Sequence, residues 1–385
     1  MAIQRHAEIA GGGIAGLAAG MMLARSGWSV RVHERSSEIR ESGAGIYLRD
    51  NSLNVLDEYG LFERLAEQGT KLERALSIDR NGAIRQDIPV PKAARSYVVP
   101  RQALVDVLAY GARAAGVEIA LNSEVQSATP EGRLLLSDGR VLSADLVIAA
   151  DGFNSRVRDS LGLGARHWEL ATAVNRHFIP NRIITPQPEA IQYWSGNRRI
   201  GVAPSGPNHT YVFSVMPNRD AIAKQLPLNM ADWTRAFPRL REQLPVIAAA
   251  PVTQYRYVMV DCPRWHSGRI AIIGDAAHGL PPTLGQGAGL SIMNARTLAE
   301  ALGRENDPLK ALPYWESCMR FISDQTQLWS CRYDLFTRAW PTQLEFLRPL
   351  IFWTFNNFPS LTDRMRIADR GLTLTPLRPA SVKTA

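Results

Sequence analysis

Three glycines near the start of the chain have the spacing of a phosphate-binding turn. Gly11, Gly13 and Gly16 form a Gly-x-Gly-x-x-Gly pattern between a short apolar run and a segment rich in Ala, Leu and Met. The first glycine of such a turn permits the tight bend, the second lets a pyrophosphate approach the backbone, and the third lets helix and strand pack closely. Glu34 follows Gly16 by 34 − 16 = 18 residues, where a carboxylate accepts the hydroxyls of an adenosine ribose. The pattern predicts a bound dinucleotide and does not choose between NAD and FAD.

A second segment, residues 269–289, makes that choice. Its apolar run ends at Gly274 and Asp275, and a loop rich in small residues follows from Pro282 to Gly289. A carboxylate at the end of a buried strand suits a ribityl or sugar hydroxyl. Backbone N–H groups at the start of the next helix would stabilise negative charge on a reduced flavin ring. The segment favours FAD.

The elements that would position these residues begin with a strand–helix–strand unit. Residues 7–10 and 28–33 are predicted strands, and residues 14–26 form the helix between them. Further predicted helices are 51–68, 102–115, 285–303 and 308–334; predicted strands are 117–121, 146–149 and 269–273; a hairpin is predicted around Asp138-Gly139.

The sequence pattern changes between residues 165 and 260, where short predicted strands, prolines and polar turns dominate. Residues 76–100 have a similar pattern of predicted strands and turns with prolines. We therefore expect an α/β fold with two interleaved lobes. The first would use residues 1–70, 97–170 and 262–334, and a β-sheet substrate lobe would use 71–96 and 171–261. Residues 335–385 would form a C-terminal helical cap and tail.

Composition excludes several other classes of protein. The 385 residues include 45% hydrophobic and 21% charged residues, which argues against disorder. Three cysteines without a CxxC pair predict neither a disulfide framework nor a metal site. The net charge of +8 is scattered, so we expect no nucleic-acid partner, and anionic cofactors and substrates explain the basic balance. With no signal peptide or membrane-spanning run, the sequence predicts a cytoplasmic monomer or homodimer with membrane binding unlikely.

Together with the segment DLVIAADGFNSRVR around Asp151, the two motifs resemble the three signatures of single-component FAD-dependent aromatic hydroxylases, the p-hydroxybenzoate hydroxylase family. The match runs in order over about residues 5–330. Within the family, the stretch through Glu34 and Tyr47 is most similar to the hydroxypyridine-carboxylate oxygenases. The resemblance implies a Rossmann lobe of the glutathione-reductase type interleaved with a β-sheet substrate lobe. It also implies non-covalent FAD, NADH or NADPH as reductant, and oxygen transfer through a flavin C4a-hydroperoxide.

The resemblance also implies which residues contact FAD. Arg40 and Arg101 match arginines near the pyrophosphate and ribityl chain, and Asp151 lies in a segment associated with FAD and the nicotinamide. The full set of implied cofactor-binding positions is Gly11, Gly13, Ile14, Ala15, Gly16, Glu34, Arg35, Arg40, Arg101, Asp151, Asp275, Gly285, Gly287, Ala288 and Gly289.

Four positions are the candidates for the substrate side and for catalysis. Pro282 matches a proline against the flavin ring, and Tyr47 stands where several relatives carry a histidine base. Arg199 and Tyr211, on neighbouring predicted strands, resemble a substrate-binding pair; the arginine could instead be an exposed strand residue, and Tyr47 a packing residue. His209 and His278 are weaker candidates. Arg74 replaces a pocket tyrosine of the relatives, which predicts a more basic pocket.

The aromatic segment 340–358 has three open interpretations: a cap over the substrate pocket, a dimer surface, or an interfacial membrane helix. The sequence favours the cap.

We expect oxygenation of a small acidic hydroxypyridine-type aromatic, with ring opening or loss of a side chain as a further step left open. Alternatives are a hydroxybenzoate or a bulky quinone or polyketide substrate, another flavin enzyme such as a prenyl-lipid reductase, or an FAD-binding module without turnover. A halogenase would carry a WxWxIP motif, which the sequence lacks.

Overall fold

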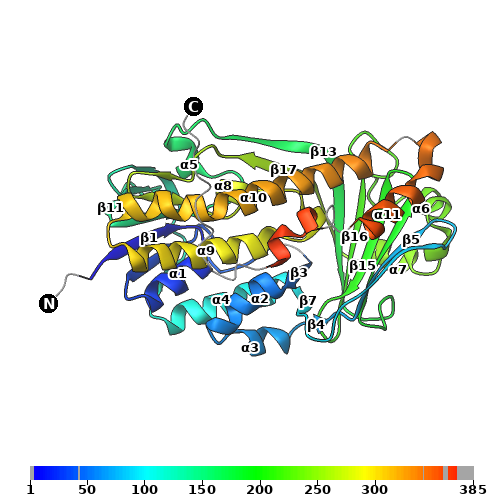
Figure 1. Cartoon of the computed structure of the whole chain (residues 1–385), viewed down its shortest axis with the longest axis horizontal. Helices are drawn as coiled ribbons and strands as arrows, with labels where there is room; N and C mark the ends of the chain where they lie inside the picture. The colour runs from blue at the N-terminus through cyan, green and yellow to red at the C-terminus, as the bar shows by residue number, and fades with distance from the viewer. Residues whose placement is uncertain (1–3, 42–43, 341, 359–362, 371–385) are drawn as a thin grey trace.

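The computed structural model describes residues 4–41, 44–340, 342–358 and 363–370. Two lobes lie side by side, and a long helix, α10 (Pro308–Arg338), runs along both of them (Figure 1). The order of elements follows the predicted interleaving, because the chain enters the second lobe twice and returns to the first. The lobe boundaries proposed from the sequence stay a prediction.

The first lobe is built on a six-stranded sheet. Its strand order is β18-β19-β12-β1-β2-β8, parallel except where β18 joins antiparallel to β19. Strands β1 and β12 are almost wholly buried, which explains their continuous apolar runs. The bounds are β1 His6–Ala10, β2 Ser29–His33, β8 Glu118–Ala120, β12 Leu146–Ala149, β18 His266–Ser267 and β19 Ile270–Ile272.

Helices cover this sheet. The helix α1 (Ile14–Arg25) packs on α4 (Arg101–Ala114) and on α9 (Gly287–Arg304). The Rossmann-type beginning and the hairpin around Gly139 are as predicted. The predicted helix over 51–68 is wrong: α2 (Asp50–Glu58) and α3 (Phe62–Ala66) are separated at Gly60, whose φ of 71° ends the helix. Two short helices, α5 (Arg156–Ser160) and α8 (Asp275–His278), follow strands.

The second lobe is a seven-stranded sheet of order β17-β13-β16-β15-β14-β5-β6. One face packs against α6 (Met230–Ala236) and α7 (Leu244–Ala249) around the fully buried Trp233. Neither helix is predicted from the sequence. The strands are β5 Arg74–Asp79, β6 Ile84–Pro89, β13 Arg166–Ile179, β14 Glu189–Ser195, β15 Arg198–Pro204, β16 Thr210–Pro217 and β17 Val252–Asp261.

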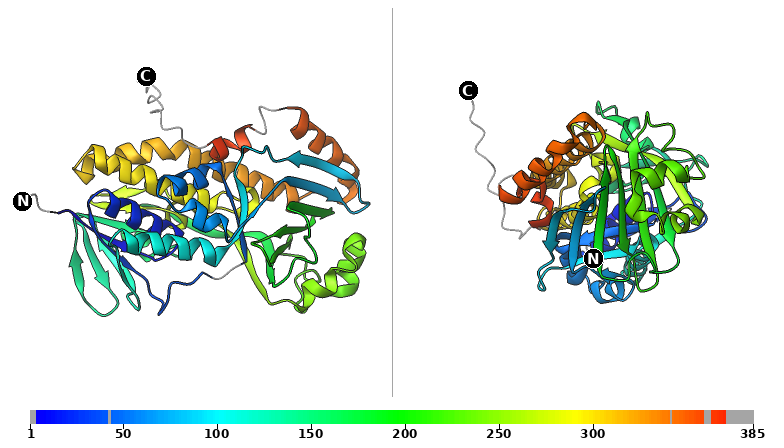
Figure 2. Two further views of the ribbon diagram at one scale, coloured as in Figure 1. Left: turned by 90° about the horizontal axis from the view of Figure 1, so that it is seen from below. Right: turned by 90° about the vertical axis from the view of Figure 1, so that its right-hand side faces the viewer.

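Smaller elements join the lobes. A three-stranded sheet, order β3-β7-β4, carries the chain out of the first lobe, and a second one, order β11-β10-β9, forms its outer edge (Figure 2). Their bounds are β3 Gly45–Arg49, β4 Thr70–Lys71, β7 Ser96–Pro100, β9 Val125–Thr129, β10 Arg133–Leu136 and β11 Val141–Ser143. The 3-10 turns are η1 Pro238–Leu240, η2 Pro282–Leu284, η3 Thr342–Leu347 and η4 Ile367–Arg370.

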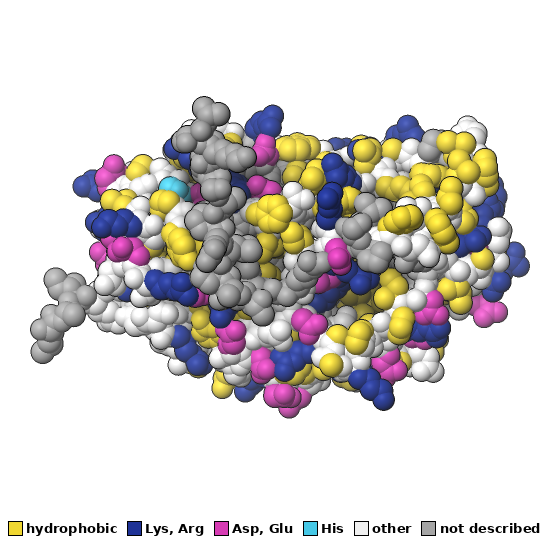
Figure 3. All heavy atoms as spheres, in the orientation of Figure 1, with side chains coloured by type: hydrophobic (Ala, Val, Ile, Leu, Met, Phe, Trp, Pro, Cys, Tyr) yellow, Lys and Arg dark blue, Asp and Glu magenta, His cyan; other side chains and the backbone are white. Residues whose placement is uncertain are grey.

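The aromatic segment ends in α11 (Arg348–Asn357) and faces two environments. Phe352 is buried, with its ring 5.5 Å from that of Trp194. Phe346, Trp353 and Phe358 are at least half exposed, and hydrophobic side chains gather at this end of the molecule (Figure 3). Within the described residues, no helix is both long and apolar enough to cross a bilayer. The segment therefore covers part of the sheet lobe with one side only.

Gly16 provides a test of how closely α1 approaches the strand before it. A Cβ at Gly16 would lie 2.0 Å from the carbonyl oxygen of Gly11, so Gly16→Ala must push the helix away from the turn. We expect a loss of about 1–3 kcal/mol in the free energy of unfolding of the apoprotein, measured by chemical denaturation. Gly303→Ala is the matched control because nothing lies within 4 Å of its Cβ position. It should gain about 0.5–1 kcal/mol, and equal effects at both positions would contradict the argument.

Candidate active site

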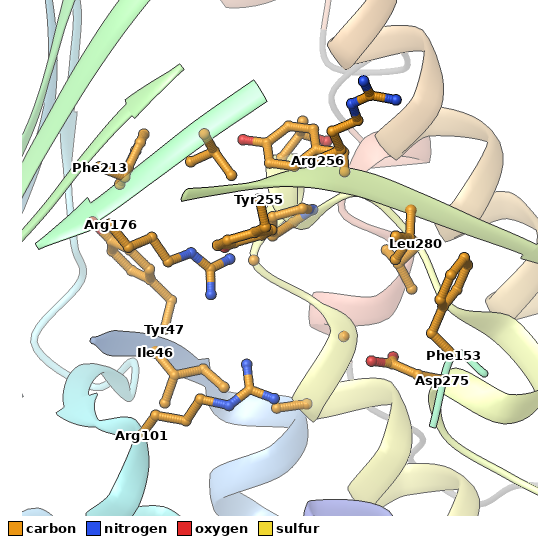
Figure 4. Close-up of a pocket in the computed structure, with 18 of the residues that line it drawn as sticks. Ile46, Tyr47, Arg101, Phe153, Arg176, Phe213, Tyr255, Arg256, Asp275 and Leu280 are labelled. Atoms are coloured by element: carbon orange, nitrogen blue, oxygen red, sulfur yellow. The ribbon is translucent and has the colours of Figure 1, made fainter. Parts of the chain in front are cut away.

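A cavity of about 900 Å³ lies between the two lobes. The first lobe contributes the glycine turn, β3, the start of α4 and the segment from η2 into α9, and the sheet lobe contributes side chains of β13, β15, β16 and β17. Arg101 and Arg176 point into the cavity from opposite sides, and Asp275 points into it from a third (Figure 4). The cavity therefore brings together residues that are up to 291 − 13 = 278 positions apart, Gly13 and Ser291.

The glycine turn is shaped for an anionic group at the N-terminus of α1. Gly11 has a φ of 100°, and a Cβ there would lie 2.4 Å from the carbonyl oxygen of Ala150. At Gly13, which lines the cavity, the nearest atom to a Cβ would be 3.6 Å away, so space remains above the backbone. No acidic residue stands in the first turn of α1 to compete for its N–H groups. These features fit the pyrophosphate of FAD.

Charged residues around the turn are arranged less simply than the sequence implies. The Glu34 carboxylate accepts from the backbone N–H of Gly12 at 3.0 Å, beside the turn but outside the cavity lining. The Arg101 side chain lines the cavity and pairs with Glu41 at 2.8 Å. Arg35 and Arg40 are exposed and outside the lining, and the Arg40 guanidinium lies 3.5 Å from Glu38. The structure thus brings only Arg101 of the three predicted arginines to the cavity.

Two aspartates with raised pKa values follow the ends of neighbouring strands. The Asp275 carboxylate lines the cavity and has no hydrogen-bond partner among the described residues, and desolvation raises its pKa against the opposing charge of Arg101. Such a carboxylate fits a hydroxyl of a ligand. Asp151 instead accepts from the hydroxyl of Ser155 at 2.5 Å and lies outside the lining, with its pKa also raised by burial. Asp151 therefore orders the chain behind the turn, next to Gly152, which does line the cavity.

The loop before α9 is held by contacts on its far side. Gln286 accepts from the Asn51 amide at 2.9 Å and donates to Asp369. Pro282, Gly285, Gly287 and Ala288 face the cavity, and nothing lies within 4 Å of a Cβ position at Gly287. Gly289 packs against Asn51 and lies outside the lining. The helix begins at Gly287, so the predicted loop over 282–289 ends earlier than expected and its last residues are the first turn of α9.

Tyr47 and Tyr211 meet across the cavity from β3 and β16, with ring centroids 6.4 Å apart. Burial raises the pKa of Tyr47 well above its ordinary value, and proximity to Tyr211 adds to the effect. Burial likewise raises the pKa of Tyr257 to about 12, although Arg199 and Arg176 oppose that rise. The phenols of Tyr47 and Tyr257 are therefore protonated at neutral pH and can donate hydrogen bonds.

Arg199 is buried, not an exposed strand residue. Only 3% of its surface is accessible, and its guanidinium lies 5.3–5.5 Å from the ring centroids of Trp194, Phe213 and Tyr333. Among the described residues, the guanidinium donates to the amide oxygen of Gln192 at 3.3 Å, and its Nε has no partner. A buried cation in an aromatic surround without a carboxylate is ready to receive an acceptor from a ligand.

Sequence reasoning did not identify several lining residues of the sheet lobe, namely Arg176, Gln192, Phe213, Tyr255 and Tyr257. They share one face of the sheet, which strand alternation alone cannot distinguish from the other face. Three other candidates lie away from the cavity lining. His209 stacks on Phe178, His278 contacts Asn294 with its pKa lowered by burial to about 4, and Arg74 pairs with Asp87. Arg74 therefore does not make the pocket basic, although other arginines do.

Comparison with known proteins shows the family of this chain. The model of the FAD binding domain family matches residues 5–306. A putative 2-heptyl-3-hydroxy-4(1H)-quinolone synthase of Rhodococcus erythropolis is 37% identical, covering 84% of this chain and 86% of its own length. A 2-heptyl-3-hydroxy-4(1H)-quinolone synthase of Mycobacteroides abscessus is 36% identical, covering 86% and 90%. A putative FAD-dependent monooxygenase of Bacillus subtilis is 32% identical, covering 80% and 87%.

Among solved structures, the tetrameric form of 2-methyl-3-hydroxypyridine-5-carboxylic acid oxygenase superposes with a TM-score of 0.84 at 32% identity, covering 96% of each chain. The fold inferred from the three sequence motifs is thus confirmed. The chain belongs to the FAD binding domain family and is an FAD-dependent monooxygenase.

Proposed function

We propose that this protein uses NADH or NADPH and O2 to place one oxygen atom on a nitrogen-containing aromatic ring of the pyridinol or 4-pyridone type. The observation that carries the proposal is the absence of a base suited to a phenol. Among the described residues that line the cavity there is no histidine, and burial raises the pKa of Tyr47 and of Tyr257, so both phenols stay protonated. The substrate must therefore bring its own activation.

A nitrogen heteroaromatic supplies that activation. In a 4-quinolone, the lone pair of the ring nitrogen is conjugated through the carbon–carbon double bond to the carbonyl group, which makes carbon 3 nucleophilic without loss of a proton. A hydroxypyridine is likewise more easily ionised than a phenol because its ring nitrogen withdraws charge. An unactivated phenol would need a general base beside its hydroxyl, and the described lining residues include no histidine for that role.

The chain's own residues have separable tasks. The glycine turn, Arg101 and Asp275 would hold FAD, and the first turn of α9 would stabilise negative charge at its ring. When bound, FAD supplies the reduced flavin that activates O2. Tyr47 and Tyr211 donate hydrogen bonds to the substrate's ring oxygen, and Phe213 with the rings around Arg199 keeps water out of the space between the lobes.

The leading candidate substrate is a 2-alkyl-4(1H)-quinolone that is hydroxylated at carbon 3. Support comes from the two relatives at 37% and 36% identity, whose names give that product. This candidate replaces the small acidic pyridine as our first choice and keeps the pyridine-type ring.

The second candidate is a hydroxypyridine carboxylate, favoured by one observation. Arg199 is a buried cation without a carboxylate partner in the described part of the chain, and a substrate carboxylate would satisfy it. A neutral quinolone would use the same guanidinium as a donor to its ring oxygen.

Turnover with a matched panel tests the proposed function. The yellow holoenzyme is mixed with NADH or NADPH and with 2-heptyl-4(1H)-quinolone, 6-hydroxynicotinate or 4-hydroxybenzoate, and products are weighed by mass spectrometry. We expect faster reductant oxidation and a product one oxygen heavier with a nitrogen heteroaromatic, and neither with the benzoate. Oxygenation of 4-hydroxybenzoate alone would refute the proposal.

Tyr47→Phe tests the protonated state of the phenol. Because the Tyr47 pKa is raised, the hydroxyl stays protonated from about pH 6 to about pH 9 and its removal leaves the shape of the pH profile of kcat/KM unchanged. The loss of one donor should lower kcat/KM about two- to tenfold. Disappearance of a limb of the wild-type profile would instead show that Tyr47 titrates and acts as a base.

Arg199→Gln separates the two substrate candidates. For a pyridine carboxylate, loss of a charge-assisted contact should raise KM about ten- to a hundredfold while FAD stays bound. For a neutral alkylquinolone the rise should stay below about tenfold because the variant loses only a hydrogen bond donated to a neutral acceptor. Arg219→Gln, an exposed residue of the same lobe, controls for the change in charge. An unchanged KM for whichever compound is turned over would remove Arg199 from the site.

A further inference from the structure

Arg176 is a second cation of the sheet lobe that faces the cavity. It lies on β13, and its guanidinium points into the cavity opposite Arg101 (Figure 4). The guanidinium lies 4.6 Å from the centroid of the Tyr255 ring, on the neighbouring strand β17. Stacking of this kind fixes the plane of the guanidinium and so the direction of its N–H groups.

The polar groups of this pair are not satisfied within the described protein. The Nε of Arg176 and the hydroxyl of Tyr255 are both shielded from water and have no hydrogen-bond partner. Arg176 also has no carboxylate within ion-pair distance among the described residues. An N–H and a hydroxyl left in this state each cost free energy that a bound acceptor would recover.

Other arginines that line the cavity are already paired. Arg101 pairs with Glu41, Arg49 with Asp369 and Arg256 with Glu169, each through a contact of 2.5–2.8 Å. Arg176 thus differs from its neighbours in chemistry, and it resembles Arg199 in having an open donor.

The strand register separates Arg176 from Arg199. Arg176 stands opposite Phe213 on β16, and Phe213 stands opposite Gly201 on β15, so Arg199 lies two strands away and two residues along. Phe213 lies on β16, the strand between those that carry the two arginines. The Tyr257 hydroxyl is close enough to both arginines for each to oppose the rise in its pKa. The two cations can therefore hold different groups.

We propose that Arg176 and Tyr255 form a second anion subsite in this cavity, which takes a carboxylate or phosphate oxygen of a small molecule that enters from the sheet side. The planar guanidinium donates two N–H groups to the anion and the Tyr255 hydroxyl donates a third bond. Two sources share this chemistry: an acidic substituent of the aromatic substrate, and a phosphate of the nicotinamide nucleotide. The inference rests on the proposed function only in taking the cavity as the place where these molecules approach the flavin.

Calorimetric titration of the oxidised holoenzyme tests the subsite without turnover. The probes are 6-hydroxynicotinate for a substrate carboxylate and NADP+ for a nucleotide phosphate. Arg176→Gln is compared with Arg166→Gln, which removes the same charge from an exposed position of the same strand. We expect the Kd of one or both probes to rise at least tenfold in Arg176→Gln and to stay within about twofold in the control.

The pattern of results identifies the source. A rise for 6-hydroxynicotinate alone assigns the subsite to the substrate, and a rise for NADP+ alone assigns it to the nucleotide. Tyr255→Leu should give a smaller rise for the same probe because the ring under the guanidinium is lost, while Arg176→Lys should restore part of the affinity. FAD content must match the wild type throughout.

Unchanged Kd values for both probes would overturn the proposal, as would failure of the wild-type holoenzyme to bind either probe at millimolar concentration. Because no step requires oxygen transfer, the result stands even if no compound of the turnover panel is oxygenated.

Discussion

The cavity depends on one antiparallel ribbon that belongs to both lobes. Strands β13 and β17 pair from Arg166–Asp261 at one end to His177–Val252 at the other, with a shift of register between Glu169 and Ala173. At the end nearer the first lobe, Val260 is fully buried in the core of that lobe, and its backbone is held by Gly279 and by the amide of Gln327 on α10. Past the shift, the same ribbon carries Arg176 and Tyr255 over the cavity. The same pair of strands thus packs into the first lobe at one end and lines the cavity at the other. The distance between the glycine turn and the seven-stranded sheet is therefore set by backbone hydrogen bonds.

The charge distribution inside the cavity depends on which of its arginines have a carboxylate partner. Carboxylates pair with the arginines on the first-lobe side, as Glu41 does with Arg101. The sheet side presents Arg176 and Arg199 without such partners. Burial raises the pKa of Tyr257 on that side and of Tyr47 on β3, which keeps both phenols neutral. The cavity is therefore suited to electron-rich or anionic ligands and poorly suited to taking a proton from them. Unpaired arginines together with neutral phenols favour a substrate ring that is nucleophilic without giving up a proton to the protein.

The sequence predicts best where chemistry and local structure coincide. Gly11, Gly13 and Gly16 are recognisable because a tight turn, a phosphate and a helix packing contact each require a residue without a Cβ, all within six positions. The loop before α9 and Asp275 follow the same logic. In contrast, α6 and α7 are short helices whose stability comes from the buried Trp233 and its contacts with the sheet, which no local pattern announces. The break at Gly60 was missed because the leucine spacing of 51–68 continues across it.

Arg176 and Tyr255 could not be assigned from the sequence for a different reason. A strand places alternate residues on opposite faces, but which face meets the cavity depends on the register with a strand that is 255 − 174 = 81 positions away at Tyr255. The arginine expected to make the pocket basic, Arg74, pairs with Asp87 on the adjacent strand, and Arg176 takes that role. The cavity therefore has the predicted positive charge, but Arg176 supplies it. Its place in the cavity follows from the register of β13 with its neighbouring strands.

Gly201 shows that packing outside the cavity lining can fix the position of a lining side chain. Its position on β15 lies on the cavity face beside Arg199, and a Cβ there would be 2.0 Å from the end of the Phe213 ring. The ring can lie flat across the neighbouring strand only because that strand has a glycine at this point. Any larger residue at 201 would displace the Phe213 ring, which lines the cavity. The position of a lining side chain is thus set by a residue that does not itself line the cavity, because close packing leaves the ring no room beside a larger neighbour.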